Sequence, residues 1–467
     1  MEFDYGVDIY KSEIIKKIQD FVRIKSTRGY FKKNQPFGRG PLNALNYVLK
    51  LGQTFGFKCE NFDGYAGHVE YGEGNEIVGI LVHVDVVKEG KGWTYPPFGG
   101  EIHDGKIFGR GSFDNKGGCI ASLYALKVLK DKGLVLNKKV RIIFGCNEES
   151  GMQDIPYYLS KNKEPDVAFS PDSPFPVVYG ESGILDLVLT KKIKINQNQG
   201  LFNIEHIQGG EMHKKVPGLC SILIDKNQNR ELDLMTLFTK YIKTKKVNVE
   251  SLEKGDKIFV KYNGISCSAI HPENGDNAIS GMMDILNSLP LNNGDLKDFI
   301  TFFEKTIGQT IHGEKIKYPV QDDISSPLTF CPTMIDYHRK TLKMHIHIRY
   351  PIKMEYDKLI ANIKKITSTY SIEMKVKQHS QPHYIPVSSF LVKSLMNVYK
   401  EETGNYDIKP ITMAGGTYAR TLKNAVGFGA LFPGEKQVAH EVNEYLNIDS
   451  IIKATKIYAK AIYELAR

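Results

Sequence analysis

Two stretches in which strand and helix patterns alternate lie at opposite ends of this 467-residue chain, and a long stretch of another kind separates them. In the first stretch, residues 77–87 and 139–146 are apolar, β-branched runs that predict buried strands, and residues 117–131 predict a helix between them. This alternation is typical of a mostly parallel sheet flanked by helices. A chain of this length also exceeds what one hydrophobic core usually supports, so we expect two domains.

The middle of the chain has the pattern of a different fold class. Residues 184–195, 256–267 and 342–352 predict strands of an antiparallel sheet, and residues 276–289 predict a helix among them. Strands and helices of this kind predict an α+β arrangement rather than a parallel α/β sheet.

Near residue 385 the first pattern returns. Residues 388–402 and 449–466 predict helices, and residues 424–431 predict a strand. The simplest interpretation is one α/β domain built from both ends of the chain, with the α+β domain inserted into it. The expected boundaries are 1–182 and 385–467 for the α/β domain and 183–384 for the inserted domain.

The composition excludes several classes of protein. A hydrophobic content of 41% and a charged content of 25% fit a globular protein in solution, and no window holds the roughly 18 consecutive apolar residues that a membrane span needs. The N-terminus lacks the apolar core of a signal peptide, and six scattered cysteines without a CxxC pair indicate reduced thiols, so we expect a cytoplasmic protein. The formal charge of +9 comes from dispersed lysines, so no nucleic-acid or membrane partner is expected.

Acidic and imidazole side chains gather at predicted strand ends and turns, where open α/β sheets form their sites. The run LVHVDVV carries His83 and Asp85 two positions apart, hence on one face of the predicted strand. The others are Asp114, Glu148, Glu149, Asp172 and His440. Each alone is typical of a core, cap or surface position, but together they suit divalent ions such as Zn²⁺ or Mn²⁺. Asp85 can then hold the second ring nitrogen of His83.

Five motifs in a fixed order carry a family resemblance. The segments HVDVV, GRGSFDNKG, NEES, SPDSPFP and HEVNEY resemble the two-metal aminopeptidase-like hydrolases, the group of PepV-type dipeptidases, aminoacylases and succinyl-diaminopimelate desuccinylases. The resemblance covers nearly the whole chain and is strongest to the PepV-type dipeptidases, which carry an inserted domain of similar length. It implies an aminopeptidase-like catalytic domain and an inserted lid domain.

The resemblance also implies roles for the site residues. Asp114 would bridge two divalent ions, Zn²⁺ first and Mn²⁺ or Co²⁺ as alternatives. His83 and Asp172 would complete the coordination of one ion, and Glu149 and His440 would complete that of the other. Glu148 would act as general base toward the water between the ions, because a carboxylate that ligates a metal is a poor base, and Asp85 would orient His83.

In the inserted segment some positions match the substrate contacts of the family, and two positions differ from it. Arg349, in HIRYP, matches the arginine that holds the substrate carboxylate, and Gly415, Gly416 and Thr417 match the glycine turn of the family. Ser268 stands where relatives carry a lid histidine, and Lys214 stands where they often carry asparagine. His271, three residues after Ser268, is therefore an open candidate for the substrate site. His345 and His347 alternate on the strand before Arg349 and so share one face. They could line the cleft, but the sequence favours a solvent-facing pair.

The reaction class that follows is metal-dependent hydrolysis of dipeptides or very short peptides by a monomer, since the long insertion would replace a second subunit's lid. Two alternatives stay open at this point. One is an N-acyl amino acid amidohydrolase with the same chemistry, and the other is a catalytically weakened relative that binds peptide or metal without turnover.

Overall fold

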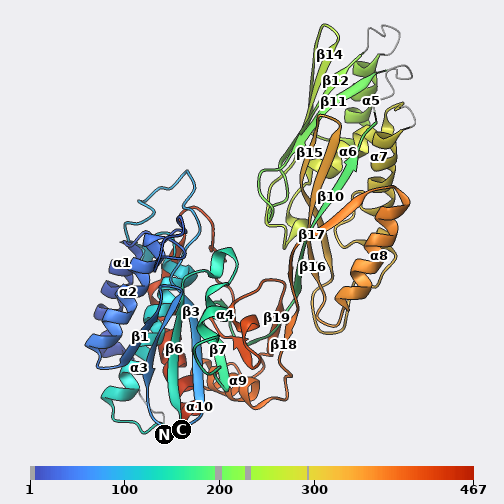
Figure 1. Cartoon of the computed structure of the whole chain (residues 1–467). Helices are drawn as coiled ribbons and strands as arrows, with labels where there is room; N and C mark the ends of the chain where they lie inside the picture. The colour runs from blue at the N-terminus through green and yellow to red at the C-terminus, as the bar shows by residue number, and fades with distance from the viewer. Residues whose placement is uncertain (1–5, 195–201, 227–232, 292–293) are drawn as a thin grey trace. The chain divides into compact units, whose positions relative to one another are not determined.

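The structure is a computed structural model of the chain. Its described residues are 6–194, 202–226, 233–291 and 294–467. They separate into two compact units, each with a sheet of its own (Figure 1). Unit 1 comprises Met1–Gly180, Tyr384–Thr412 and Gly416–Arg467, and unit 2 comprises Glu181–His383 and Met413–Gly415. Within the described part of the chain, no helix is both long and apolar enough to cross a membrane.

The main sheet of unit 1 is mixed, with a parallel centre. Its strands are β1 (Lys58–Phe62), β2 (Ala66–Tyr71), β3 (Ile77–His83), β6 (Lys139–Gly145), β7 (Val167–Ser170), β9 (Val178–Glu181), β18 (His383–Tyr384), β19 (Ile411–Met413) and β20 (Ala425–Gly427). The described order is β1-β2-β6-β3-β7-β20-β9-β18, with β19 beside β9. Strands β6, β3, β7 and β20 pair in parallel, and β1 and β2 extend the sheet in the antiparallel sense.

Smaller strands of unit 1 form ribbons beside the main sheet. These are β4 (Glu101–His103), β5 (Lys106–Phe108) and β22 (Tyr445–Asn447), which pair with one another, and β8 (Ser173–Pro174) and β21 (Ala430–Leu431), which pair in parallel. The ribbon of β5 and β22 joins segments from the two ends of the chain, so the unit cannot be assembled from either end alone.

Helices cover both faces of the unit 1 sheet. They are α1 (Lys11–Val22), α2 (Arg39–Thr54), α3 (Gly118–Asp131), α4 (Asp154–Leu159), α9 (Phe390–Thr403) and α10 (Ile448–Ala466), with the short η1 (Val7–Tyr10), η2 (Ser112–Gly117), η3 (Glu148–Ser150) and η6 (Tyr418–Thr421). Along β3, Ile80 and Val82 pack into the core that α1, α2, α3, α9 and α10 share. Leu81 points to the opposite face and packs with residues of α4 and η6, as strand alternation requires.

The sheet of unit 2 is antiparallel throughout its described pairs. Its strands are β10 (Gly183–Lys192), β11 (Asn203–Gly209), β12 (Leu219–Asp225), β13 (Val249–Lys254), β14 (Lys257–Asn263), β15 (Thr329–His338), β16 (Thr341–Tyr350) and β17 (Glu373–Ser380), in the order β13-β14-β12-β11-β15-β16-β10-β17. The helices α5 (Leu234–Lys245), α6 (Ala278–Ser288), α7 (Asp295–Thr306) and α8 (Tyr356–Thr369) share a core with one face of this sheet. The short turns η4 (Pro272–Asn274) and η5 (Glu314–Ile316) complete the unit.

The predicted fold class, a mostly parallel sheet flanked by helices together with a separate α+β part, is confirmed. Most predicted elements agree with the structure within two or three residues, because their apolar periodicity is local; α10 begins one residue before the prediction, with Asn447 capping its first N–H groups. Three predicted strands end four residues earlier than expected: β3 ends at His83, β14 at Asn263 and β20 at Gly427. The last part of the predicted strand 424–431 is instead β21, which belongs to another sheet. Residue 195, the end of another predicted strand, lies outside the described residues.

Candidate metal and catalytic site

Four of the predicted site residues lie at one edge of the unit 1 sheet. His83 is the last residue of β3, Glu148 and Glu149 follow the end of β6 in η3, and Asp172 lies two residues past the end of β7. Because β6, β3 and β7 are neighbouring parallel strands, their carboxyl ends meet at the same edge. The topology therefore collects these side chains from segments that are far apart in sequence.

Asp114 and His440 reach this edge from connecting segments. Asp114 lies in η2, just before α3, and His440 lies before β22 with a left-handed backbone conformation, φ 66°. Asp114 Oδ1 is 2.9 Å from His83 Nε2, and Asp114 Oδ2 is 3.2 Å from His440 Nε2. The two oxygens of one carboxylate therefore face two different imidazoles.

The remaining two carboxylates lie on opposite sides of Asp114. Asp172 Oδ2 is 3.5 Å from His83 Nε2, whereas Glu149 Oε2 is 3.0 Å from His440 Nε2. Ligand atoms of His83, Asp114 and Glu149 all lie within 4.8 Å of one another. The structure thus brings the five predicted metal ligands together in two groups that share Asp114.

Asp85 contacts this cluster in a different way from the one expected. Because β3 ends at His83, Asp85 lies in the following loop, not on the same strand face. Its main-chain carbonyl accepts a hydrogen bond from His83 Nδ1 at 2.9 Å, and its carboxylate Oδ1 is 3.5 Å from the same nitrogen. The carboxylate accepts the main-chain N–H groups of Glu148 and Glu149, at 3.1 and 3.3 Å. Because Nδ1 is held by the Asp85 main chain, Nε2 is the nitrogen of His83 that faces Asp114 and that would ligate an ion.

Glu148 differs from its neighbours because its carboxylate makes no hydrogen bond or ion pair with any described residue. Burial raises the pKa of Glu148 well above its ordinary value; the charge of His83 opposes this shift, and the carboxylates of Asp172 and Glu149 add to it. A carboxyl group with an elevated pKa and no fixed partner is suited to accept and return a proton.

The charge balance of the cluster tests whether divalent cations fit it. Among the described residues, the ion-pair partners of Asp114, Asp172 and Glu149 are imidazoles, with no lysine or arginine. Burial and the nearby charge of Asp114 raise the pKa of Asp172 to about 6. Carboxylates that repel one another in a buried site are stabilised by divalent cations, and the oxygen and imidazole donors match Zn²⁺ and Mn²⁺. The residues present therefore fit metal ions.

Glu444 is a site residue that sequence reasoning missed. It is fully buried, and its Oε1 accepts the main-chain N–H groups of Gly111, Phe113 and Asp114 at 3.0–3.1 Å. Its Oε2 accepts Arg110 Nη1 at 2.6 Å. This carboxylate holds the main chain that carries Asp114. Its position four residues after His440 is the one available signal, and it is weak in a segment rich in polar residues.

Asn115 was also missed, although it adjoins Asp114. Its Nδ2 donates to the Pro171 carbonyl at 2.6 Å and to Asp172 Oδ1 at 3.2 Å. The next residue, Lys116, is fully buried. It donates to the main-chain carbonyl of Phe21, in the last turn of α1, and to that of Ile24, just after the helix. Segment η2 is therefore tied both to Asp172 and to the first helix.

The model of the peptidase family M20/M25/M40 matches residues 79–464, most of the chain. The chain belongs to this family. As a member it is a peptide hydrolase, and the expected resemblance to the two-metal hydrolases is confirmed. A Bacillus subtilis protein named "Putative dipeptidase YtjP" is 35% identical over the full length of both chains, and a Staphylococcus haemolyticus protein named "Putative dipeptidase SH1171" is 31% identical over 98% of each.

Among solved structures, human carnosine dipeptidase 1 has a similar fold. Its TM-score with this chain is 0.59 at 14% identity, and the alignment covers 98% of this chain and 97% of the human one. The M20 metallo-carboxypeptidase Sso-CP2 of Sulfolobus solfataricus gives 0.57 at 19% identity, covering 97% and 99%. At these identities the likeness concerns the fold, and it agrees with the architecture of both units.

In unit 2 of this M20/M25/M40 chain, the predicted substrate-binding Arg349 lies beside the predicted glycine turn. Arg349 lies at the end of β16 and is 4% exposed, and its Nη1 donates to the carbonyl of Ala414 in the glycine turn at 3.0 Å. Gly415 is the next residue of that turn and belongs to unit 2.

The other end of the glycine turn lies in unit 1. Thr417 caps η6, where its hydroxyl accepts the N–H of Ala419 at 3.1 Å. A Cβ at Gly416 would lie 2.9 Å from the guanidinium carbon of Arg420, so a larger residue there would displace the end of that flexible side chain.

The histidines of unit 2 differ in exposure. The side chain of His271 is 62% exposed and contacts Glu273 Oε1 at 3.1 Å. His347 is fully buried, so the expectation of a solvent-facing pair is wrong for it, and the reason is that polar partners on its own sheet face enclose it. His345 is half-buried and packs on the ring of His213, with centroids 4.7 Å apart.

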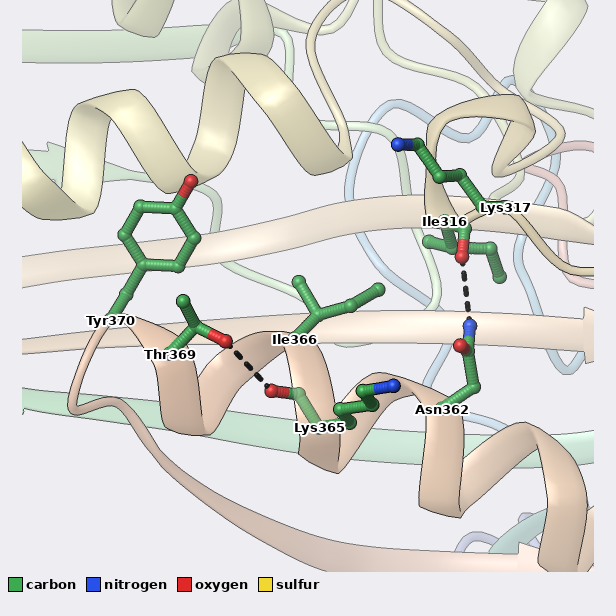
Figure 2. Close-up of a pocket in the computed structure, with 7 residues that line it drawn as sticks. All are labelled: Ile316, Lys317, Asn362, Lys365, Ile366, Thr369 and Tyr370. Atoms are coloured by element: carbon green, nitrogen blue, oxygen red, sulfur yellow. Dashed lines mark hydrogen bonds between the residues drawn. The ribbon is translucent and has the colours of Figure 1, made fainter.

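A separate cavity of about 270 Å³ lies in unit 2 beside α8 and η5 (Figure 2). It is lined by Ile316, Lys317, Asn362, Lys365, Ile366, Thr369 and Tyr370. Asn362 donates to the Ile316 carbonyl at 2.8 Å, and Thr369 donates to the Lys365 carbonyl at 3.1 Å, so both polar side chains bond the local main chain. The seven lining residues include no member of the predicted site.

Proposed function

We propose that this member of family M20/M25/M40 is a dipeptidase that works with two divalent ions, Zn²⁺ first and Mn²⁺ or Co²⁺ as alternatives. The observation that carries the proposal is the position of Asp114, whose two oxygens face His83 and His440 at 2.9 and 3.2 Å. In this proposal Asp114 is shared, His83 and Asp172 hold one ion, and Glu149 and His440 hold the other.

The ions would polarise the peptide carbonyl and lower the pKa of a water molecule. Glu148 would accept the proton of the attacking water and deliver it to the amine that leaves. Two observations support this role: its carboxylate is unengaged among the described residues, and its main-chain N–H is held by Asp85. Asp85 would thereby position both the base and the His83 ring.

Unit 2 and the relatives support the proposed substrate class. The names of the two bacterial relatives describe dipeptidases, and we extend that activity to this chain. Residues 183–384 would act as a lid, and Arg349 would bind the α-carboxylate of the substrate beside Gly415, Gly416 and Thr417. His271, the histidine nearest in sequence to Ser268, would be a further substrate contact, because its imidazole is largely exposed.

The test is turnover by metal-stripped protein reconstituted with Zn²⁺, Mn²⁺ or Co²⁺. Substrates would be a dipeptide library beside N-acetyl and N-succinyl amino acids. Glu148→Gln should lower kcat by about 10²–10⁴-fold while the bound metal stays stoichiometric. The exposed Glu60 offers a matched control, and Glu60→Gln should keep the parent rate.

Each other outcome points to a different protein. Turnover confined to acyl amino acids would establish an amidohydrolase instead. Stoichiometric metal and tight peptide binding without cleavage would indicate a weakened relative, as the replacement of the family's lid histidine by Ser268 would allow. A Glu148→Gln variant as active as the parent would remove Glu148 from its role.

We also propose a cytoplasmic monomer. The six cysteines are free thiols in the structure, which suits a reducing compartment. Light scattering after size exclusion should give a mass near 52.7 kDa, the mass of one chain. A mass of two chains would contradict the monomer. Fractionation of producing cells, with the protein expected in the cytoplasmic fraction, would test the location.

A further inference from the structure

Three polar residues share one face of the unit 2 sheet. Asp186 on β10 and His347 on β16 are directly opposite one another in the antiparallel register, and Arg349 is two residues beyond His347. The neighbours of His347 along β16, Ile346 and Ile348, point to the helix-covered core. The polar row therefore lies on the face away from that core, where cross-strand neighbours are close enough to bond.

The three side chains form a continuous chain of hydrogen bonds. Asp186 Oδ1 is 2.6 Å from His347 Nδ1, and Arg349 Nε donates to His347 Nε2 at 2.9 Å. Arg349 Nη1 donates to the Ala414 carbonyl at 3.0 Å, and the Arg349 main-chain N–H bonds Thr329 Oγ1 at 3.3 Å. Two contacts at different nitrogens of one planar guanidinium set both its position and its plane.

These contacts determine the state of the imidazole. Arginine nitrogens donate only, so Nε2 of His347 must accept and Nδ1 must carry the proton that goes to Asp186. A doubly protonated ring would present a donor to the Arg349 Nε–H and break the chain. Full burial and the charge of Arg349 lower the pKa of His347 although Asp186 opposes this, which agrees with a neutral ring.

We infer that His347 and Asp186 are positioning residues that hold the Arg349 guanidinium ready for the carboxylate of the substrate, and that they thereby set the preference for a free C-terminus. The inference rests on the proposed function, since it concerns the same substrate carboxylate. Arginine is long and flexible, and an unsupported guanidinium would have to be ordered each time a substrate binds. A guanidinium whose position is fixed before binding avoids this loss of side-chain conformational entropy.

The experiment compares matched substrates, a dipeptide and the corresponding dipeptide amide, which lacks the carboxylate. The parent should prefer the free acid in kcat/KM. In His347→Ala and Asp186→Ala this preference should fall on the order of tenfold to a hundredfold, mostly through KM, while the amide is cleaved within twofold of the parent rate. His347→Gln should restore part of the preference, because an amide oxygen can accept from Arg349 Nε.

His345→Ala is the control, since His345 lies on the same strand face and its described ring contact is with His213. It should leave the preference unchanged. A purely structural role of His347 would lower both substrates equally, and an unchanged preference in His347→Ala would overturn the inference.

A second measurement keeps the inference separable from the proposed function. Histidine ¹⁵N NMR, assigned with His347→Gln, should show an unprotonated Nε2 on His347, and a protonated Nε2 would overturn the hydrogen-bond chain regardless of activity. A parent that cleaves no dipeptide at all would refute the proposed function, whereas a parent that cleaves acid and amide equally would refute the positioning role.

Discussion

At the scale of single residues, the carboxylates of unit 1 divide by what their oxygens bond. Asp85 and Glu444 accept main-chain N–H groups and hold segments in place. Asp114 faces imidazoles with both oxygens, and the side-chain carboxylate of Glu148 makes no hydrogen bond with a described residue. Chemically identical groups therefore acquire separate tasks, because their environments differ in donors and burial.

His68 gives a residue-scale prediction about pH. It is 2% exposed on β2, and Tyr158 Oη lies 2.8 Å from its Nδ1. Burial, and next the charge of Arg141, lower its pKa from 6.5 to about 4. Between these values the unfolded chain binds a proton that the folded chain does not, so stability falls as pH falls from about 6.5 toward 4.

The measurement is urea unfolding of the parent and of His68→Gln at pH 7 and pH 5. Trp93 fluorescence is the signal, since the sequence has one tryptophan and it lies in unit 1. Between the two pH values the parent should lose about 2 kcal/mol more unfolding free energy than His68→Gln, in which position 68 cannot titrate. Equal losses in the two proteins would contradict the assigned shift.

At the scale of elements, the site depends on how η2 and the segment before β22 are joined. Glu444 makes this junction, because it bonds three N–H groups of the chain around η2 and also Arg110. In Glu444→Gln, the amide NH₂ group must face either the main-chain N–H groups or Arg110, and all of these are donors. We expect a loss of about 3 kcal/mol in stability. Since Asp114 shifts with η2, Zn²⁺ affinity should fall about 10- to 100-fold.

Chelator competition for Zn²⁺, together with urea unfolding followed by Trp93, would measure both effects. Glu441→Gln is the matched control, because Glu441 is an exposed glutamate of the same segment. It should change neither quantity. Unaltered Zn²⁺ affinity in Glu444→Gln would show that the junction is structural only.

At the scale of the whole molecule, the two units have separate hydrophobic cores. The five candidate ligands all belong to unit 1, and the core beneath the helices of unit 2 contains none of them. Anything that binds the folded form of one unit stabilises that unit by mass action. Metal binding should therefore act on one unfolding transition more than on the other.

Removal of metal tests this expectation. Adding Zn²⁺ at about 100 times its Kd to stripped protein should stabilise unit 1 by about 2.7 kcal/mol. The Trp93 transition should then move up by about 5–10 °C. A second calorimetric transition, which Trp93 fluorescence does not report, should keep its midpoint temperature. Asp114→Asn should abolish the Zn²⁺-induced shift of the Trp93 transition. Equal shifts of both transitions would mean that the units unfold together.

The sequence by itself determined the elements and the class of the fold. Apolar periodicity is a property of neighbouring residues, so β6, α3 and α10 could be located without tertiary information. The order of the motifs also indicated which imidazoles and carboxylates would share a site. His440 and Asp114, 326 positions apart in the chain, do lie 3.2 Å apart.

Only the tertiary structure decided which polar residues have partners. Asp186 meets His347 from 161 positions away, and Glu444 meets Gly111 from 333, so no local pattern marks either pair. The end of β3 at His83 likewise turned Asp85 toward the N–H groups of Glu148 and Glu149. Burial of a polar group is favourable only where another segment supplies a complementary donor or acceptor, and that supply is fixed by how distant strands pack.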